Sequence, residues 1–278
     1  MGDTAVTILC DNEGSKGLKT EHGLALLVER PDGALLADCG ASGAFIDNAR
    51  SLGRDLSAVR AVTLSHNHFD HTRGFLSFTE AYSHEYTLWL SSHFFKTSAW
   101  RKESDRGALT PTSGPITAAS LCKDNVNFKL VGEDVFELPS LSGVYLMCNI
   151  PRSISFETAD ERDLICRDGE WQTDDYRDEL AVIIQTDAGL LLLAGCAHVG
   201  LCNMTKCASE RFGAPVSAVI GGAHLVPYGA ERAELTANYL KTAGVRSLVA
   251  CHCTGELGFA SLGRQGFEKG FCGRTETF

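Results

Sequence analysis

One short segment constrains the fold of this 278-residue chain more than any other. Residues 65–74 read Ser-His-Asn-His-Phe-Asp-His-Thr-Arg-Gly and directly follow Val59–Leu64, an apolar stretch that predicts a strand. Three imidazoles and a carboxylate so close together are poorly suited to an apolar core. The carboxyl end of a strand, where the chain turns into a helix, is where ligand sites of α/β proteins lie. A solvated polar loop is the plain alternative.

The spacing of these polar side chains favours metal binding. In an extended segment His66 and His68 point to the same side and can share one ion. Where the chain turns into the helix, Asp70 and His71 can reach an adjacent position. Such nitrogen and oxygen donors are typical of zinc, iron or manganese, and two ions a few ångströms apart would use all four.

Three further histidines follow predicted strands much later in the chain. Each lies in a loop of small residues, although any one of them alone is also compatible with a structural histidine. His22, His84 and His93 have weaker contexts, and for the last two a structural role is the favoured interpretation. The three loops are Gly195-Cys196-Ala197-His198, Gly221-Gly222-Ala223-His224 and Cys251-His252-Cys253-Thr254-Gly255.

The order of the predicted elements indicates an α/β (α+β) protein made of two halves, each a sheet with outer helices. Two long polar segments, 96–117 and 149–178, are predicted to be loops that frame the site. We expect one domain over residues 1–278. The predicted strands are Thr4–Cys10, Gly23–Glu29, Ala34–Ala37, Val59–Leu64, Thr87–Leu90, Val126–Val131, Gly143–Met147, Leu180–Thr186, Leu190–Ala194, Val216–Ile220 and Ser247–Ala250. The predicted helices are Ala41–Leu52, Gly74–Tyr82, Leu201–Phe212 and Ala230–Ala243.

Composition excludes several classes of protein. The formal net charge of −10 argues against a nucleic-acid-binding surface. No run of 18 apolar residues is present, so we expect no membrane partner, and no secretory signal is visible. The 11 cysteines are odd in number in a chain too long for a disulfide scaffold, which favours reduced thiols and a cytoplasmic location.

The chain resembles the metallo-β-lactamase superfamily, whose marker is this H-x-H-x-D-H strand–loop–helix. More closely, it looks like the branch named for a dihydropterin-methyl transferase of methanopterin biosynthesis. The resemblance implies a four-layer αββα sandwich with the metals at one edge. The stretches that carry it are Glu21-His22-Gly23, Asp38-Cys39-Gly40, Leu64-Ser65-His66, Ile150-Pro151-Arg152, the three loops given above and residues 66–71.

The resemblance also implies a ligand set for two divalent metal ions. Zinc is the first expectation for both ions, with iron and manganese as alternatives. His66, His68 and His198 would hold one ion, and Asp70, His71 and His252 the other. Asp70, His198 and His252 are thereby the expected catalytic residues, and Asp38 is expected to orient a ligand histidine from behind.

The sequence departs from the superfamily pattern at one ligand position. Most members end the strand before residue 196 with Gly-Asp, whose carboxylate bridges the ions, whereas Cys196 follows Gly195 here. Three interpretations stay open: Cys196 bridges as a thiolate, His198 replaces the bridge, or the second site is weak. A buried, small apolar role for Cys196 is a further alternative.

A two-metal site activates water and polarises carbonyl or phosphoryl oxygens. The general expectation is therefore a metal-dependent enzyme that hydrolyses an anionic small molecule. The branch resemblance implies instead condensation of a dihydropterin-methyl diphosphate with an aryl amine. A non-catalytic sensor or redox protein on the same fold is the alternative, and the oligomeric state stays open. Structural zinc binding through Cys251, Cys253 and Cys272 is a third alternative, which the poor Cys-x-Cys spacing disfavours. The expected substrate contacts are Arg152, His224 and Glu157, with Arg152 as the candidate anion contact.

Overall fold

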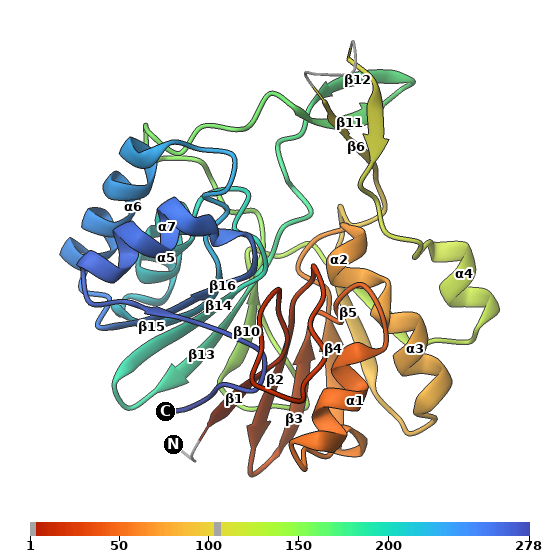
Figure 1. The fold of residues 1–278 in the computed structure, drawn as a ribbon. Coiled ribbons are helices and arrows are strands. Elements are labelled where there is room, and N and C mark those ends of the chain that lie inside the picture. The colour runs from red at the N-terminus through yellow and green to blue at the C-terminus, as the bar shows by residue number, and fades with distance from the viewer. Residues whose placement is uncertain (1–3, 103–106) are drawn as a thin grey trace.

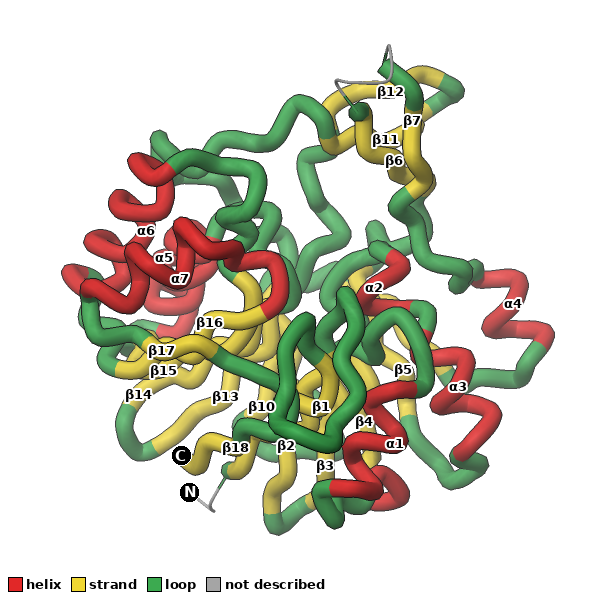
Figure 2. Tube along the Cα trace, viewed as in Figure 1, coloured by secondary structure: helices red, strands yellow, loops and turns green. Residues whose placement is uncertain are grey.

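The computed structural model describes residues 4–102 and 107–278. Two seven-stranded sheets face each other, and helices cover the outer face of each, so the chain folds as an αββα sandwich (Figures 1 and 2). Helices α1 and α3 lie on the first sheet, and α5, α6 and α7 lie on the second. The helices are α1 Ala44–Ser51, α2 Phe69–Thr72, α3 Gly74–Ala81, α4 Ala118–Lys123, α5 Leu201–Phe212, α6 Ala230–Thr242 and α7 Gly255–Arg264.

The first sheet has the strand order β18-β1-β2-β3-β4-β5-β8. Strands β1 to β3 pair antiparallel, whereas β3, β4, β5 and β8 pair parallel, which places the end of β4 and the His-rich loop at one edge. The strands are β1 Ala5–Cys10, β2 Ala25–Arg30, β3 Gly33–Ala37, β4 Val59–Thr63, β5 Thr87–Ser91, β8 Phe128–Val131 and β18 Thr275–Thr277.

The second sheet has the order β17-β16-β15-β14-β13-β10-β9. Strands β14, β15 and β16 run parallel, so their carboxyl ends meet at one edge and bring the three histidine-bearing loops together. The strands are β9 Val135–Glu137, β10 Val144–Met147, β13 Ala181–Thr186, β14 Gly189–Ala194, β15 Val216–Gly222, β16 Ser247–Cys251 and β17 Glu268–Lys269.

Side-chain alternation along the central strands builds the layers. On β14, Leu191 and Leu193 join the core between the sheets, whereas Leu190 and Leu192 join the core under the outer helices. Because both faces are buried, the strand is a continuous apolar run rather than an alternating one. This is the pattern that made Leu190–Ala194 predictable as a strand.

A third, four-stranded sheet of order β12-β11-β6-β7 rises above the sandwich (Figures 1 and 2). It corrects the prediction that segments 96–117 and 149–178 are loops, because their strands pair with each other across the sequence: Ala99 of β6 lies opposite Leu164 of β11. Residues 103–106 of the first segment lie outside the described residues. The strands are β6 Thr97–Arg101, β7 Leu109–Pro111, β11 Asp163–Arg167 and β12 Glu170–Thr173.

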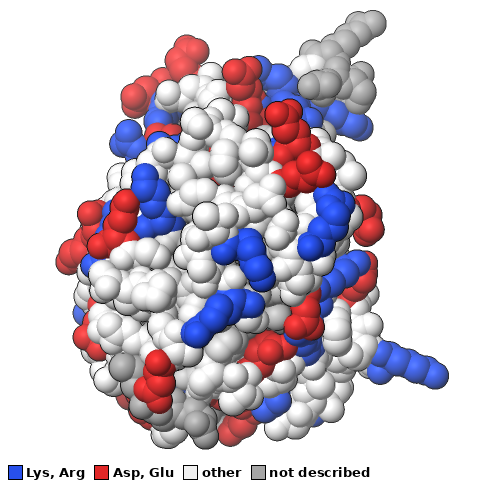
Figure 3. Space-filling view, turned by 90° about the vertical axis from the view of Figure 1, so that its left-hand side faces the viewer, with Lys and Arg blue, Asp and Glu red and all other residues white. Residues whose placement is uncertain are grey.

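The face over α5, α6 and α7 carries acidic and basic side chains side by side, with uncharged surface between them (Figure 3). No helix within residues 4–102 and 107–278 is both long and apolar enough to cross a membrane.

Candidate metal centre

Four loops at the sheet edges carry backbone strain. Asp38 follows β3, and Ala197, His224 and His252 follow β14, β15 and β16, all with left-handed φ angles of 59°, 62°, 44° and 54°. Such angles are unfavourable for residues with a Cβ and persist where the surrounding structure enforces them. Their clustering at one edge therefore marks the place where the fold presents its polar side chains.

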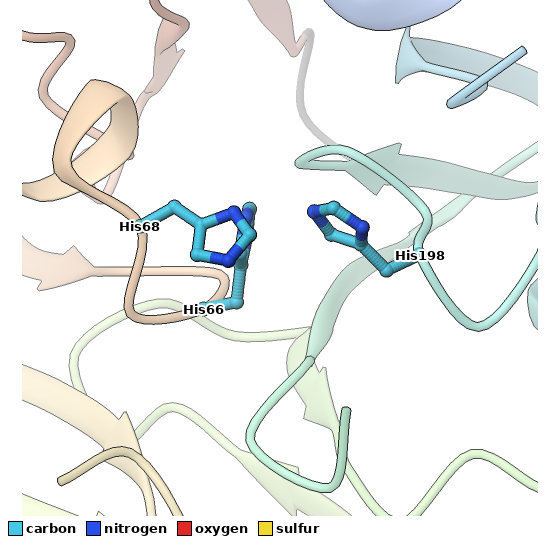
Figure 4. Close-up of side chains that lie close together, drawn as sticks. All are labelled: His66, His68 and His198. Atoms are coloured by element: carbon cyan, nitrogen blue, oxygen red, sulfur yellow. The ribbon is translucent and has the colours of Figure 1, made fainter. Parts of the chain in front are cut away.

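Three imidazoles form the first donor group. His66 and His68, from the β4–α2 loop, point toward His198, from the loop after β14 (Figure 4), and one nitrogen of each lies within 4.8 Å of the others. His66 Nε2 and both ring nitrogens of His198 are buried and have no hydrogen-bond partner within the described part of the chain. Burial lowers the pKa of all three side chains, to about 3 for His68, so each keeps a lone pair at neutral pH.

The second donor group surrounds the carboxylate of Asp70. Oδ2 of Asp70 lies 3.2 Å from His252 Nε2, 3.1 Å from His22 Nε2 and 3.8 Å from His71 Nε2. His71 and His252 are buried, whereas His22 is exposed. The fold thus brings Asp70, His71 and His252 together, as the resemblance implies, and adds His22 from the loop before β2.

Hydrogen bonds behind the rings aim the lone pairs inward. Asp38 accepts from His71 Nδ1 at 2.7 Å and from Ser65 Oγ at 2.8 Å, and Ser65 Oγ lies 2.9 Å from His66 Nδ1. Asn12 Oδ1 accepts from His252 Nδ1 at 3.0 Å. With the Nδ1 proton held in each case, the Nε2 atoms turn toward the donor cluster, the arrangement typical of metal-binding histidines, and that of His71 lies 3.1 Å from Cys196 Sγ.

Electrostatics couple Asp70 to His71. Burial opposes the charged form of both groups, but their mutual attraction and the Asp38 carboxylate dominate. The pKa of Asp70 is held well below its ordinary value, and that of His71 is raised to about 9. The metal-free fold therefore keeps an ion pair at this position, and a cation bound there would displace the His71 proton.

Two thiols complete the donor cluster. Cys196 Sγ lies 3.1 Å from His71 Nε2, and it forms one donor group with His252 and Cys253 and another with His198 and His224. Burial raises the pKa of Cys253, but hydrogen bonds with Cys196 and His224 outweigh it and lower that pKa. All eleven cysteines lie in the described residues, and each is a free thiol.

A buried cation supports the first donor group from behind. The ammonium group of Lys96 lies 2.7 Å from Asp174 and 2.6 Å from Asp178, and 4.4 Å from the ring centroid of Tyr176. Tyr176 in turn stacks on His198, with ring centroids 3.9 Å apart and planes 7° apart. These contacts tie the base of the third sheet to one of the candidate ligands.

The donor cluster opens into a cavity of about 420 Å³ between the two sheet edges and the third sheet. His68, Asp70, Cys196, His198 and His252 lie on its floor. The wall carries His224, the expected substrate contact, together with residues from the segments that were expected to frame the site. These are Trp100, Thr112, Asp160, Arg162 and Asp163.

Two expected substrate contacts lie elsewhere. Glu157 is buried, and its carboxylate accepts from the backbone N–H groups of Cys202 and Asn203, in the first turn of α5. It caps that helix rather than facing the cavity, which corrects its interpretation as a substrate residue. Arg152 is not among the residues that line the cavity, and its Nη1 atom donates to the Glu157 carbonyl oxygen.

Three residues of the site were not predicted from the sequence. His22 and Cys253 lie in stretches that carry the family resemblance but were not assigned as ligands of the two ions, and that position was their only signal. Asp163 on β11 lies 4.0 Å from His224 Nε2 and accepts from the Tyr176 hydroxyl at 2.8 Å. Nothing in its local sequence marks it. His84, bonded to the Val59 carbonyl, and the exposed His93 belong to none of the donor groups.

Comparisons with known proteins agree with the αββα fold. Residues 18–133 match the family model described as "Metallo-beta-lactamase superfamily". A curated relative from Methanocaldococcus jannaschii, 7,8-dihydropterin-6-methyl-4-(beta-D-ribofuranosyl)-aminobenzene-5'-phosphate synthase, is 28% identical over 85% of this chain and 82% of its own. The crystal structure of Tm1679, a metal-dependent hydrolase of the beta-lactamase superfamily, has a TM-score of 0.84 and 25% identity over 98% of both chains. Zinc-bound PqqB from Methylobacterium extorquens shares the fold alone, with a TM-score of 0.56 and 12% identity over 98% of this chain and 99% of its own.

Proposed function

This chain belongs to the metallo-β-lactamase superfamily, and we propose that it is a two-metal enzyme acting on a phosphorylated or otherwise anionic small molecule. The observation that carries the proposal is the set of buried ring nitrogens without a hydrogen bond among the described residues, on His66, His198, His224 and His252, beneath an open cavity. A buried polar atom without a partner costs about 1–3 kcal/mol. A fold that holds several of them facing one another is therefore arranged to bind a cation.

Two metal positions fit the donors. His66, His68 and His198 offer three neutral imidazoles, and Asp70, His71 and His252 offer a carboxylate and two imidazoles, with Cys196 between the groups. Catalytic sites keep an open face, unlike closed structural sites, and the cavity supplies that face here. Zinc is the first candidate, with iron or manganese as alternatives.

When bound, such ions polarise a phosphoryl or carbonyl oxygen and offset the charge of a leaving anion. The chain itself supplies orientation. Asp38, Ser65 and Asn12 hold the ligand rings, so that the Nε2 atoms face the floor of the cavity. We assign His224 on the wall to bind the substrate, with the Asp163 carboxylate 4.0 Å from its Nε2 atom.

The reaction is either hydrolysis or condensation with an amine. In the first, water adds to the substrate and an anion leaves. In the second, the nitrogen of an aryl amine displaces diphosphate from a pterin-methyl carbon and loses its proton. The synthase relative favours condensation and the hydrolase structure favours hydrolysis. Both reactions need stabilisation of a leaving anion at the metal centre.

A non-catalytic sensor or redox protein is the second candidate. The thiols of Cys196 and Cys253 beside the histidines favour it, because sulfur ligands suit ions that change oxidation state or bind small oxidants. A panel of substrates and oxidants distinguishes the two functions.

The test uses protein purified without oxygen, stripped with chelator and reloaded with zinc, iron or manganese. The substrates are phosphodiesters, lactones, thioesters and a dihydropterin-methyl diphosphate offered with an aryl amine. We expect metal-dependent turnover of at least one of them, lost in His68→Ala and retained in His93→Ala, the exposed control. Metal-loaded protein that turns over none of them but changes its absorption spectrum with oxygen or peroxide would favour the sensor.

A further inference from the structure

We propose that Cys253, together with Cys196, ligates the ion beside His252, so that this position is a dithiolate site for a thiophilic divalent metal such as zinc or ferrous iron. The inference rests on the proposed two-metal enzyme and concerns which atoms hold one of its ions. It makes the two metal positions chemically different: one with three neutral imidazoles, the other with sulfur.

The geometry of three donors carries the proposal. Cys196 Sγ, Cys253 Sγ and a ring nitrogen of His252 all lie within 4.8 Å of one another. They come from the carboxyl ends of two parallel strands, β14 and β16, which lie on either side of β15. Three atoms at this separation can surround a single ion with the bond lengths of about 2.0–2.3 Å that nitrogen and sulfur make to zinc.

Burial distinguishes this cluster from thiols that meet by chance. The exposed fractions are 3% for Cys196, 7% for Cys253 and 4% for His252. His252 Nε2 has no hydrogen-bond partner within residues 4–102 and 107–278, while its Nδ1 atom is held by Asn12. This ring nitrogen therefore faces the donor cluster, where the Asp70 carboxylate lies 3.2 Å away, and a cation there would be shared between them.

The carboxyl end of β15 leaves room for the second sulfur. A Cβ atom on Gly222 would lie 2.6 Å from Cys253 Sγ and 2.6 Å from the carbonyl oxygen of Gly195. Only glycine at this position lets the Cys253 side chain lie against the donor cluster. The Cys253 thiol donates to the Cys196 carbonyl at 3.3 Å, so the two residues are already in contact.

Metal binding at this position is an exchange of protons for a cation. Each S–H bond breaks, its proton passes to solvent, and a sulfur–metal bond forms with no change of oxidation state. Two thiolates and the Asp70 carboxylate give a strongly anionic donor set. Thiolate donors favour zinc and iron over magnesium, calcium and manganese.

The test is titration of the metal-free protein with cobalt(II), a spectroscopic substitute for zinc. Sulfur ligation gives a near-ultraviolet charge-transfer band, which nitrogen and oxygen donors do not give. We expect the wild type to develop this band, Cys253→Ser to retain about half of its intensity with one thiolate in place of two, and the double variant with Cys196→Ser to lose it. Cys207→Ser is the matched control, because Cys207 is also buried, with 4% exposed, but lies in α5 away from the site.

The possible results of the cobalt titration separate the role of Cys253 from the proposed metal enzyme. Full band intensity in Cys253→Ser, with bound cobalt, would overturn the role of Cys253 and leave the proposed enzyme intact. Absence of any bound cobalt in the wild type would contradict the metal enzyme and the inference together. Turnover by the zinc-loaded wild type with no sulfur band in its cobalt form would overturn the inference alone.

A measurement on the wild type guards against misfolded variants. X-ray absorption of protein loaded with two zinc ions should show a zinc–sulfur shell near 2.3 Å that averages about one sulfur per zinc when both thiolates are terminal, and about one and a half when Cys196 bridges the ions. An average of about half a sulfur, or of about one with the two ions bridged by sulfur, would leave Cys196 as the sole sulfur ligand and contradict the proposal.

Discussion

The Nε2 atom of His252 lies 3.2 Å from Oδ2 of Asp70. His252 follows the last long strand of the second sheet, and Asp70 lies in α2, beside the first sheet. The contact therefore joins the facing edges of the sandwich and places His252 beside Asp70, whereas the His224 ring lies against His198 on the other side of the cavity floor. Replacing His252 and replacing His224 should therefore have different effects on metal content and turnover.

We expect His252→Ala to lose one metal ion per chain and about 100-fold or more of turnover, because a ligand is removed. His224→Ala should keep both ions and lose about 10- to 100-fold, as expected for a substrate hydrogen bond worth roughly 1–3 kcal/mol. Metal analysis and kinetics on both variants make the comparison. The reverse pattern of metal loss would show that the two loops have been assigned the wrong roles.

Glu157 should matter for stability rather than for catalysis. Replacing it with Ala leaves two N–H groups at the start of α5 without their carboxylate cap, which we expect to lower the free energy of unfolding by about 1–2 kcal/mol. Metal content and KM should stay unchanged. Urea unfolding of Glu157→Ala beside Glu161→Ala, an exposed control, measures the effect. A raised KM with unchanged stability would restore Glu157 as a substrate contact.

The Lys96 ion triad should contribute far more than a surface pair. Lys96→Ala leaves the buried carboxylates of Asp174 and Asp178 without their cation, and we expect a loss of about 3–5 kcal/mol. Lys19→Ala, which removes the exposed pair with Asp47, should cost far less, because solvent screens that pair. Unfolding curves of the two variants test the difference. Equal losses would mean that the triad does not hold the base of the third sheet.

Glu179 should make the metal-free protein less stable as pH rises. Burial raises its pKa to about 7, although the N–H groups of His198 and Val199 oppose the shift. The folded state then holds a proton that the unfolded state releases above its ordinary pKa of 4.5. Stability from this group is present below that value and declines by about 3 kcal/mol as pH rises to about 7.

The measurement is the difference in unfolding free energy between wild type and Glu179→Gln at pH 5 and pH 7. Because Gln does not titrate, the variant should lack this part of the pH dependence. Identical pH dependence in the two proteins would show that Glu179 ionises normally.

The parts of the fold that could be predicted are those with simple patterns of burial. Strands buried on both faces, such as β14, are continuous apolar runs, and α5 begins and ends where its periodicity predicts, at Leu201 and Phe212. The third sheet could not be predicted in this way. All four residues of β12 are exposed, so its sequence shows no alternation of apolar and polar residues. Helix α7 contains Gly255, Gly258 and Gly263, which conceal it because glycine is a poor helix former.

The residues of the candidate site could likewise be predicted only where a local pattern marks them. His66, His68, Asp70 and His71 lie within one motif, so their proximity follows from local spacing. His22 has no signal beyond its place in the stretch Glu21-His22-Gly23. Asp163 reaches the site from a distant segment and carries no local signal, because only the tertiary fold brings it to the cavity. The role of Glu157 was hidden for the same reason, since its partners lie in α5.

Metal content tests the central claim most directly. Protein purified without oxygen and never exposed to chelator should contain two transition-metal ions per chain by plasma-emission analysis, and His68→Ala should contain at least one fewer, while His93→Ala contains two. Less than about half an ion per chain in the wild type, in protein shown to be folded, would contradict the account, since the buried imidazoles would then be held together for some other purpose.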